Sequence, residues 1–322
     1  MEFKDETEPL LNKEDNIIEI QDVFQKDHIG INKSKIQILN KSCSCSNIFE
    51  NLFFCCIDYD LTNRQYELYL NLRNRLSIPY NQEDSNHEKL LKDFFSNLND
   101  IIPEEVENVY ENINDSNTIS TNINNESSDN ILLKKIAKTI GFQNNNPRTD
   151  FRAGGLSSLE FMNYFVDHHN LELKNILKEK YFNFALACIN LTFLFRLVLY
   201  LTNIVNTETT LKSYGLQGCT RYQIKIFSEQ LEKNSHNNVN FIFSLMSQCL
   251  IFVFKKYQNE FEYDKKDENF IKINSIIKLV IFCLKETLDN LNKNENLEDK
   301  LKIRLTKELN SEYKKIKTNY FI

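Results

Sequence analysis

Glycine and proline are scarce in this chain of 322 residues, which has six glycines, four prolines and no tryptophan. Sandwiches, barrels and doubly wound sheets need many tight turns, and tight turns draw heavily on glycine and proline. The scarcity therefore argues against those folds. Apolar residues make up 41% of the chain, enough for a sizeable core. We predict an all-α protein whose helices are joined by polar loops.

Three further signals are missing. The opening residues MEFKDETEPLL contain no apolar core of the length that a secretory signal needs. We therefore expect a cytoplasmic chain, with peripheral attachment to endomembranes as an alternative. The net charge of −6 and the lack of a long basic stripe argue against a nucleic-acid partner. No glycine-rich phosphate loop occurs, so we expect the chain to hold no nucleotide or other cofactor of its own.

Two apolar runs, residues 182–205 and 241–254, resemble membrane spans in their hydrophobicity. The first is long enough to cross a bilayer but contains Arg196, and an arginine in mid-span costs roughly 2.5–3.5 kcal/mol. The second is judged too short to cross. Both are predicted to be helices buried on nearly every side in the centre of a bundle.

The chain divides into three predicted parts. Residues 1–60 are expected to be a mobile segment, residues 61–291 a helical domain, and residues 292–322 an amphipathic helix. Residues 111–130 hold seven asparagines and four serines, and such a segment cannot offset the entropy of ordering, so we predict a disordered loop. Helical patterns cover roughly residues 131–142, 171–205, 220–232, 239–257 and 268–291.

The C-terminal segment places leucines at four-residue spacing, at Leu297, Leu301, Leu305 and Leu309. This spacing puts them on one face of a helix. We predict that this face packs on the domain. A membrane surface or a partner protein is the alternative.

The cysteines form two groups. Cys188, Cys219, Cys249 and Cys283 stand singly among apolar residues and are predicted to be small core residues. Cys43, Cys45, Cys55 and Cys56 cluster with aromatic residues, and their spacing fits no common tetrahedral zinc site. We interpret this cluster as ordinary thiols, with reversible S-acylation at a membrane contact as the alternative. His168 and His169 are adjacent, so on a helix they point about 100° apart and form a polar helix end, not a metal-binding face.

Residues 146–159, NPRTDFRAGGLSSL, place two adjacent glycines just after Arg152. Asp150 can accept backbone N–H bonds at the start of a turn, and Gly154 and Gly155 can adopt backbone angles that other residues avoid. The pattern predicts a tight corner that leads into a helix. On the residues alone, a structural role is favoured, in which Asp150 and Arg152 tie the corner to a neighbouring helix. The alternative is that the corner presents Arg152 to a partner.

Residues 141–165, GFQNNNPRTDFRAGGLSSLEFMNYF, closely resemble the signature of the ELMO domain. That signature has glycine, tryptophan or phenylalanine, and glutamine, then two variable residues, a polar residue, proline, any residue and Thr-Asp-Phe-Arg. A glycine-rich turn and a leucine-rich helix ending in Tyr-Phe follow. Residues 87–91 and 182–192 resemble flanking family segments, so the resemblance covers roughly residues 61–291. The matching motif residues are Pro147, Thr149, Asp150, Phe151, Arg152, Gly154 and Gly155.

The chain departs from the family pattern in two respects. Ala153 stands where the family usually has glycine, and Gly154 follows where a large residue is common. Phe142, and either Phe94 or Phe95, stand where the family has tryptophans.

The resemblance implies a function and an alternative. Short ELMO-domain proteins, the ELMOD class, are GTPase-activating proteins for Arf and Arf-like (Arl) GTPases in membrane trafficking, and the signature arginine, here Arg152, is the catalytic one. The other motif residues would be structural, and GTP and Mg²⁺ would belong to the partner GTPase. Long members join DOCK proteins in exchange complexes for Rac. The alternative is therefore a non-catalytic adaptor that binds a small GTPase or a DOCK-type exchange factor in cytoskeletal or phagocytic signalling.

Overall fold

The computed structural model describes residues 61–99, 101, 136–143, 146–204, 206–260 and 269–319, and in the last of these ranges the side chains from Ile271 to Asn310. Within these ranges the chain is helical and contains no strand, which confirms the all-α prediction. The predicted mobile segment, its cysteine cluster and the predicted loop at 111–130 lie outside the described residues. In chain order the helices are α3 (Asn63–Leu76), α4 (Ser85–Asn99), η3 (Pro147–Arg152), α7 (Leu156–His168), α8 (Asn170–Leu177), α9 (Phe184–Val198), α10 (Thr207–Ser213), α11 (Arg221–Lys233), α12 (Asn238–Glu260), α13 (Asn269–Asp289) and α14 (Leu297–Asn319).

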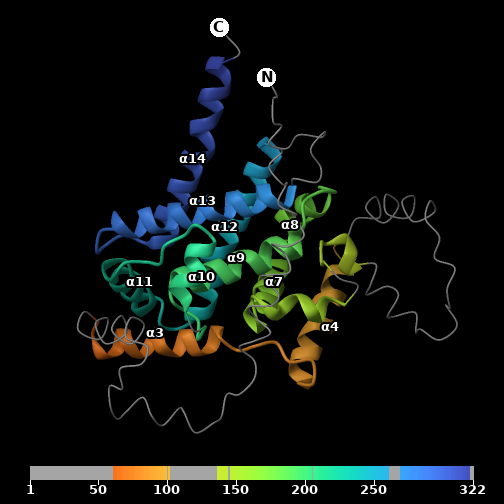
Figure 1. Cartoon of the computed structure of the whole chain (residues 1–322), viewed down its shortest axis with the longest axis horizontal. Coiled ribbons are helices and arrows are strands. Elements are labelled where there is room, and N and C mark those ends of the chain that lie inside the picture. The colour runs from red at the N-terminus through yellow and green to blue at the C-terminus, as the bar shows by residue number, and fades with distance from the viewer. Residues whose placement is uncertain are drawn as a thin grey trace, which may run out of the picture. The chain divides into compact units, whose positions relative to one another are not determined.

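Helix α9 lies in the middle of the bundle (Figure 1). Fourteen of its fifteen residues are buried, and α7, α12 and α13 pack around it. A helix that is apolar on all sides must be covered on all sides, because any exposed face would leave apolar surface in water. The sequence 184–198 therefore determines that α9 is the central helix, as predicted for this run.

The predicted helix over residues 171–205 is wrong in its extent, because the chain breaks it into α8 and α9. The break follows from a tertiary contact: the Ala185 amide donates to the Ile140 carbonyl at 2.8 Å. Ile140 precedes Gly141, whose φ of +90° ends the preceding helical turn, and a Cβ at Gly141 would stand 2.6 Å from the Cα of Asn183. Only glycine allows this close approach. Helix α10 was not anticipated.

The second apolar run, residues 241–254, belongs to a helix that extends beyond the run at both ends. It lies inside α12, which has 23 residues and, by length and composition, is the one described helix that could cross a membrane. The judgement that this run is too short to span was therefore wrong. Yet 61% of its apolar window is buried within the protein, where α7, α9, α13 and α14 cover it. Its burial is that of a core helix.

Helix α14 packs on α12 and α13 through its first three turns. Leu297, Leu301 and Leu305 are buried, and Leu309 is partly exposed. Arg304 adds polar contacts, since its guanidinium donates to Glu286 of α13 at 2.7 Å and to Glu308 at 2.7 Å. The leucine spacing therefore marks a face that packs on the domain, as predicted.

The isolated cysteines and the paired histidines lie where the sequence indicated. Cys188, Cys219, Cys249 and Cys283 are free and buried in the core. Burial raises the pKa of Cys219 to about 12 and that of Cys283 to about 11, so both are thiols at neutral pH. The two histidines, His168 and His169, stand at the end of α7.

Candidate functional site

The signature residues fold as η3, a short 3₁₀-helix between the turn at Gly141 and the start of α7. Pro147 occupies its first position, where its fixed φ suits a helix and its missing N–H costs nothing. The side-chain oxygen of Asn146 accepts from the Arg148 amide at 3.2 Å and caps the helix. Local sequence therefore defines where η3 begins.

An aromatic cluster packs against the buried side of η3. Phe151 is buried, and its ring lies 5.0 Å from that of Tyr80 and 5.7 Å from that of Phe142, centroid to centroid. Phe142 in turn lies 6.1 Å from Phe95 of α4. Such aromatic pairs contribute about 0.5–1.5 kcal/mol each beyond the area they bury. The phenylalanines expected in place of the family's tryptophans thus meet under η3.

The polar residues of the motif bind the local backbone. Asp150 accepts from the Gln143 amide at 2.7 Å, which ties η3 to the turn before it. The Thr149 hydroxyl donates to the Asn146 carbonyl at 2.9 Å. These contacts fix the backbone on either side of residues 144–145 and leave the shape of η3 little freedom.

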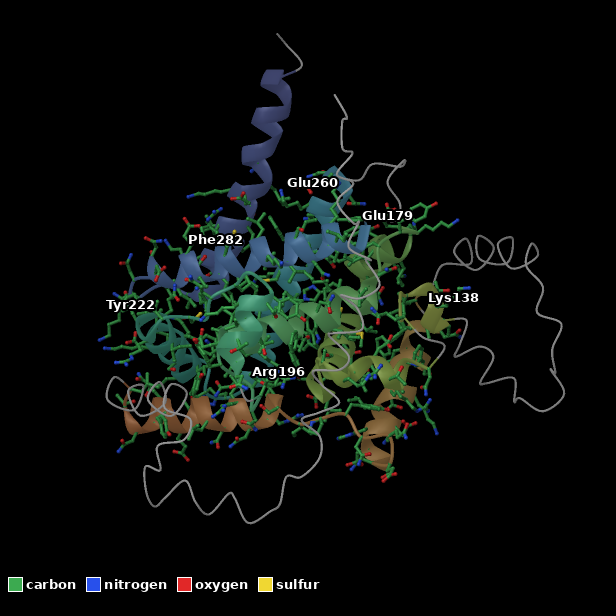
Figure 2. The ribbon with its side chains drawn as sticks, in the orientation of Figure 1. Lys138, Glu179, Arg196, Tyr222, Glu260 and Phe282 are labelled. Carbon is green, nitrogen blue, oxygen red and sulfur yellow. The ribbon has the colours of Figure 1, made fainter. Side chains whose placement is uncertain are left out.

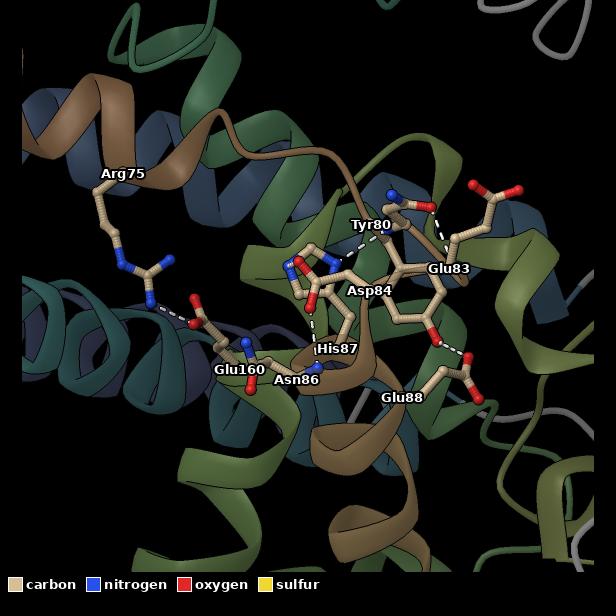
Figure 3. A network of polar contacts seen from close by, with 9 residues as sticks. Arg75, Tyr80, Glu83, Asp84, Asn86, His87, Glu88 and Glu160 are labelled. Atoms are coloured by element: carbon tan, nitrogen blue, oxygen red, sulfur yellow. Dashed lines mark hydrogen bonds and ion pairs between the residues drawn. The ribbon is translucent and has the colours of Figure 1, made fainter.

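A carboxylate of α4 anchors η3 from the side. Arg148 donates to Glu88 through two parallel bonds, Nε to Oε1 at 2.7 Å and Nη2 to Oε2 at 2.6 Å. The Tyr80 hydroxyl donates to the same carboxylate at 2.6 Å, and Figure 3 shows it pointing at Glu88 from the α3–α4 connection. Arg148 holds the pKa of Glu88 below its usual value, while burial opposes this shift. We call these three residues the Glu88 anchor.

Nothing in the sequence singled out the Glu88 anchor. Arg148 fills a variable position of the signature, and Glu88 stands out in the sequence only as part of a segment that resembles the family. The segment resemblance could have suggested that α4 contacts the signature, but not through which atoms.

The corner after η3 depends on both glycines, for different reasons. Gly155 has φ +65° and ψ −163°, a region that is essentially restricted to glycine. A Cβ there would stand 2.7 Å from the Ile78 carbonyl oxygen, which already accepts from the Leu156 amide at 3.0 Å. Gly154 has no positive φ, but the Ser158 side chain occupies the space that a Cβ would need. The backbone of the corner therefore lies in direct contact with the backbone that follows α3.

Arg152, the proposed catalytic residue, is exposed at the C-terminal end of η3. Its Nε donates to the Thr149 carbonyl at 2.7 Å within the same short helix. Among the described residues it forms no ion pair, so the ion pair that would tie the corner to a neighbouring helix is not seen there. The arrangement presents a guanidinium on a braced backbone. The described residues also contain no cluster of three or more His, Cys, Asp or Glu placed to hold a metal.

The Glu88 anchor allows a prediction about stability. We expect Glu88→Gln to lower the free energy of unfolding by about 1 kcal/mol at pH 7, because a partly exposed charged pair loses one partner. The pKa of Glu88 is lower in the folded state, so the contribution is complete above the ordinary value of 4.5 and is lost as pH falls below it. Urea unfolding at pH 7 and pH 3 measures both values.

The control for this prediction is Glu67→Gln, which removes an exposed carboxylate of α3. It should leave the stability nearly unchanged at either pH. A loss in Glu88→Gln that is as large at pH 3 as at pH 7 would show that the carboxylate charge does not stabilise η3.

Comparison with known proteins agrees with this geometry. The family model described as "ELMO/CED-12 family" matches residues 70–271, a range that includes η3, its corner, α7 and α9. No curated protein and no solved structure matches the chain. The family match supports a role connected with small GTPases, and partners of the small-GTPase or DOCK type in general. Since the match covers more than half of the residues, this chain belongs to the ELMO/CED-12 family.

Proposed function

We propose that this chain is a GTPase-activating protein for a small GTPase of the Arf or Arf-like class, and that Arg152 completes the active site of that partner. The observation that carries the proposal is the position of Arg152. It is exposed at the end of the short helix η3. Packing of Phe151, the Arg148–Glu88 hydrogen bonds and the corner at Gly155 hold this helix in place.

The chemistry of GTP hydrolysis explains why such an arginine would matter. Negative charge develops on the β–γ bridging oxygen and on the γ-phosphoryl oxygens, and a guanidinium inserted there accelerates the reaction about 10³–10⁵-fold. Arginine suits this role because its planar group stays charged and donates two parallel hydrogen bonds. The partner would contribute GTP, Mg²⁺ and the attacking water.

The contacts that hold η3 in place favour a catalytic role for Arg152. A group that is ordered before binding loses little further freedom when the partner arrives, so more of the interaction appears in the transition state. The Thr149 carbonyl orients the guanidinium through Nε. The terminal nitrogens of Arg152 are the donors that would reach the phosphate oxygens.

The alanine after the arginine is compatible with this proposal. Ala153 has φ −78° and ψ −50°, angles of an ordinary right-handed helix. Any L-residue adopts this conformation without strain. The replacement of the family's glycine by Ala153 therefore does not require η3 to aim Arg152 differently.

The test is single-turnover hydrolysis of GTP by a panel of purified Arf and Arf-like GTPases, each loaded with GTP and mixed with the whole chain. Acceleration of at least one member is the expected result. If the chain binds a GTP-loaded GTPase but accelerates none, the adaptor alternative replaces the proposal. Pull-down of a DOCK-type exchange factor without any Arf-family GTPase would point to the same alternative.

A further inference from the structure

Arg196 is a charged residue inside α9, the most apolar of the described helices. It lies near the C-terminal end of α9, and only 7% of it is accessible to solvent (Figure 2). Among the described residues no carboxylate lies within ion-pair distance of it, and burial lowers its pKa to about 10. Burying a charge without an opposite charge is costly, so its retention here calls for a specific set of acceptors.

Those acceptors belong to the corner that follows Arg152. Arg196 Nη1 donates to the Gly154 carbonyl at 2.6 Å and lies 3.4 Å from the Ser157 hydroxyl oxygen. Its Nε reaches the Leu201 carbonyl at 3.4 Å, just past the end of α9. A cation is favoured at a helix C-terminus, where the last carbonyls carry partial negative charge. The guanidinium thus joins the end of α9 to the corner.

The contact continues toward Arg152 through the backbone. Gly154 and Gly155 follow η3 directly, and the Gly155 amide donates to the Phe151 carbonyl at 2.7 Å. The Ser157 hydroxyl oxygen lies 2.8 Å from the Gly154 carbonyl oxygen and 3.1 Å from the Leu76 carbonyl oxygen, so its single proton is shared between these two acceptors. Arg196 is therefore the one charged donor, among the described residues, that grips the corner from the core side.

We propose that Arg196 is a positioning residue: by holding the Gly154 carbonyl it fixes the corner and thereby aims Arg152. The part of this proposal that concerns GTP hydrolysis rests on the proposed function. The part that concerns the corner does not. Without Arg196, the Ser157 hydroxyl still binds the Gly154 carbonyl, so the corner should persist but move more freely. A misplacement of about 1 Å is enough to cost roughly 10²-fold in rate.

The experiment compares Arg196→Met and Arg196→Lys with Arg73→Met as the matched control. Arg73 of α3 donates to the Thr202 carbonyl at 2.9 Å, next to Leu201, so its replacement removes a buried-side arginine contact to the same stretch of backbone. The Met variant removes the charge, and the Lys variant keeps it with a shorter reach. Thermal unfolding first establishes that each variant is folded, and the Lys variant serves if the Met variant is not.

The first measurement is amide hydrogen exchange in the isolated chain. Exchange at Gly155 and Leu156 should rise about tenfold or more in Arg196→Met and stay at the wild-type rate in Arg73→Met. Arg196→Lys should fall between them. Unchanged exchange at both amides in a folded Arg196 variant would overturn the proposal.

The second measurement uses the Arf-family GTPase that responds to the wild type. The maximal rate of hydrolysis should fall about 10- to 100-fold in Arg196→Met, while affinity for the GTP-loaded GTPase stays near wild type. A folded variant that keeps the full rate would overturn the aiming role. If the wild type itself accelerates nothing, the proposed function and the aiming of a catalytic Arg152 fail together, and exchange alone decides whether Arg196 holds the corner.

Discussion

Replacement of Arg152 by lysine should reduce the acceleration of GTP hydrolysis by about 10³-fold or more. Lysine keeps the positive charge, but its compact ammonium cannot donate two parallel bonds from a planar group. The Arg152 side chain is exposed, and its one described hydrogen bond is to Thr149 in the same short helix. The substitution should therefore leave folding intact. Single-turnover hydrolysis under saturating amounts of the chain gives the rate directly.

The matched control is Arg221→Lys, since Arg221 is an exposed arginine in the first turn of α11. It should accelerate hydrolysis as the wild type does. Affinity for the GTP-loaded GTPase should change far less than the rate in Arg152→Lys, because the lost interaction is made mainly in the transition state. Equal acceleration by wild type and Arg152→Lys would place the chemistry on another residue.

Replacement of Gly155 by alanine should lower the free energy of unfolding by about 4 kcal/mol. A backbone region restricted to glycine costs about 1–3 kcal/mol for other residues, and forcing packed atoms apart costs a similar amount. Both costs apply at Gly155, because its φ is +65° and a Cβ would stand 2.7 Å from the Ile78 carbonyl oxygen. Chemical denaturation measures the loss.

Gly215→Ala separates the two costs. Gly215 has a φ of +67°, but no atom lies within 4 Å of where its Cβ would be placed. Only the backbone strain remains there, and we expect a loss of about 1 kcal/mol. Equal losses in the two variants would mean that contact with Ile78 contributes nothing and that the backbone angle alone makes glycine necessary.

The fold class and many of the helices follow from the sequence because their causes are local. Few glycines and prolines exclude turn-rich folds, and apolar spacing identifies α11, α13 and the start of α14. The break between α8 and α9 could not be predicted in the same way. It depends on the hydrogen bond between Ala185 and Ile140, which lie far apart in the sequence. Tertiary contacts of this kind override local periodicity.

The candidate site divides along the same line. The corner and the position of Arg152 beside it can be predicted from the sequence, because the residues that form them are neighbours in the chain. Arg148 and Glu88 are 60 residues apart in the chain, and Arg196 and Gly154 are 42 residues apart. Neither contact can therefore be predicted from the sequence alone. In the sequence, Arg196 indicates only that residues 182–205 are unlike a membrane span. A charge inside an otherwise apolar helix nevertheless indicates that polar groups in the core bind it.

The packing of α14 has a practical consequence for preparing this protein. The family match ends at residue 271, near the start of α13, yet α13 and the leucines of α14 cover α12. The match also begins after the capping box of Thr62 and Gln65 that starts α3. A fragment cut to residues 70–271 would bare a wide apolar surface and should precipitate on expression. Fragments that avoid this should include the Thr62 capping box and extend past Leu305, the last buried leucine of α14.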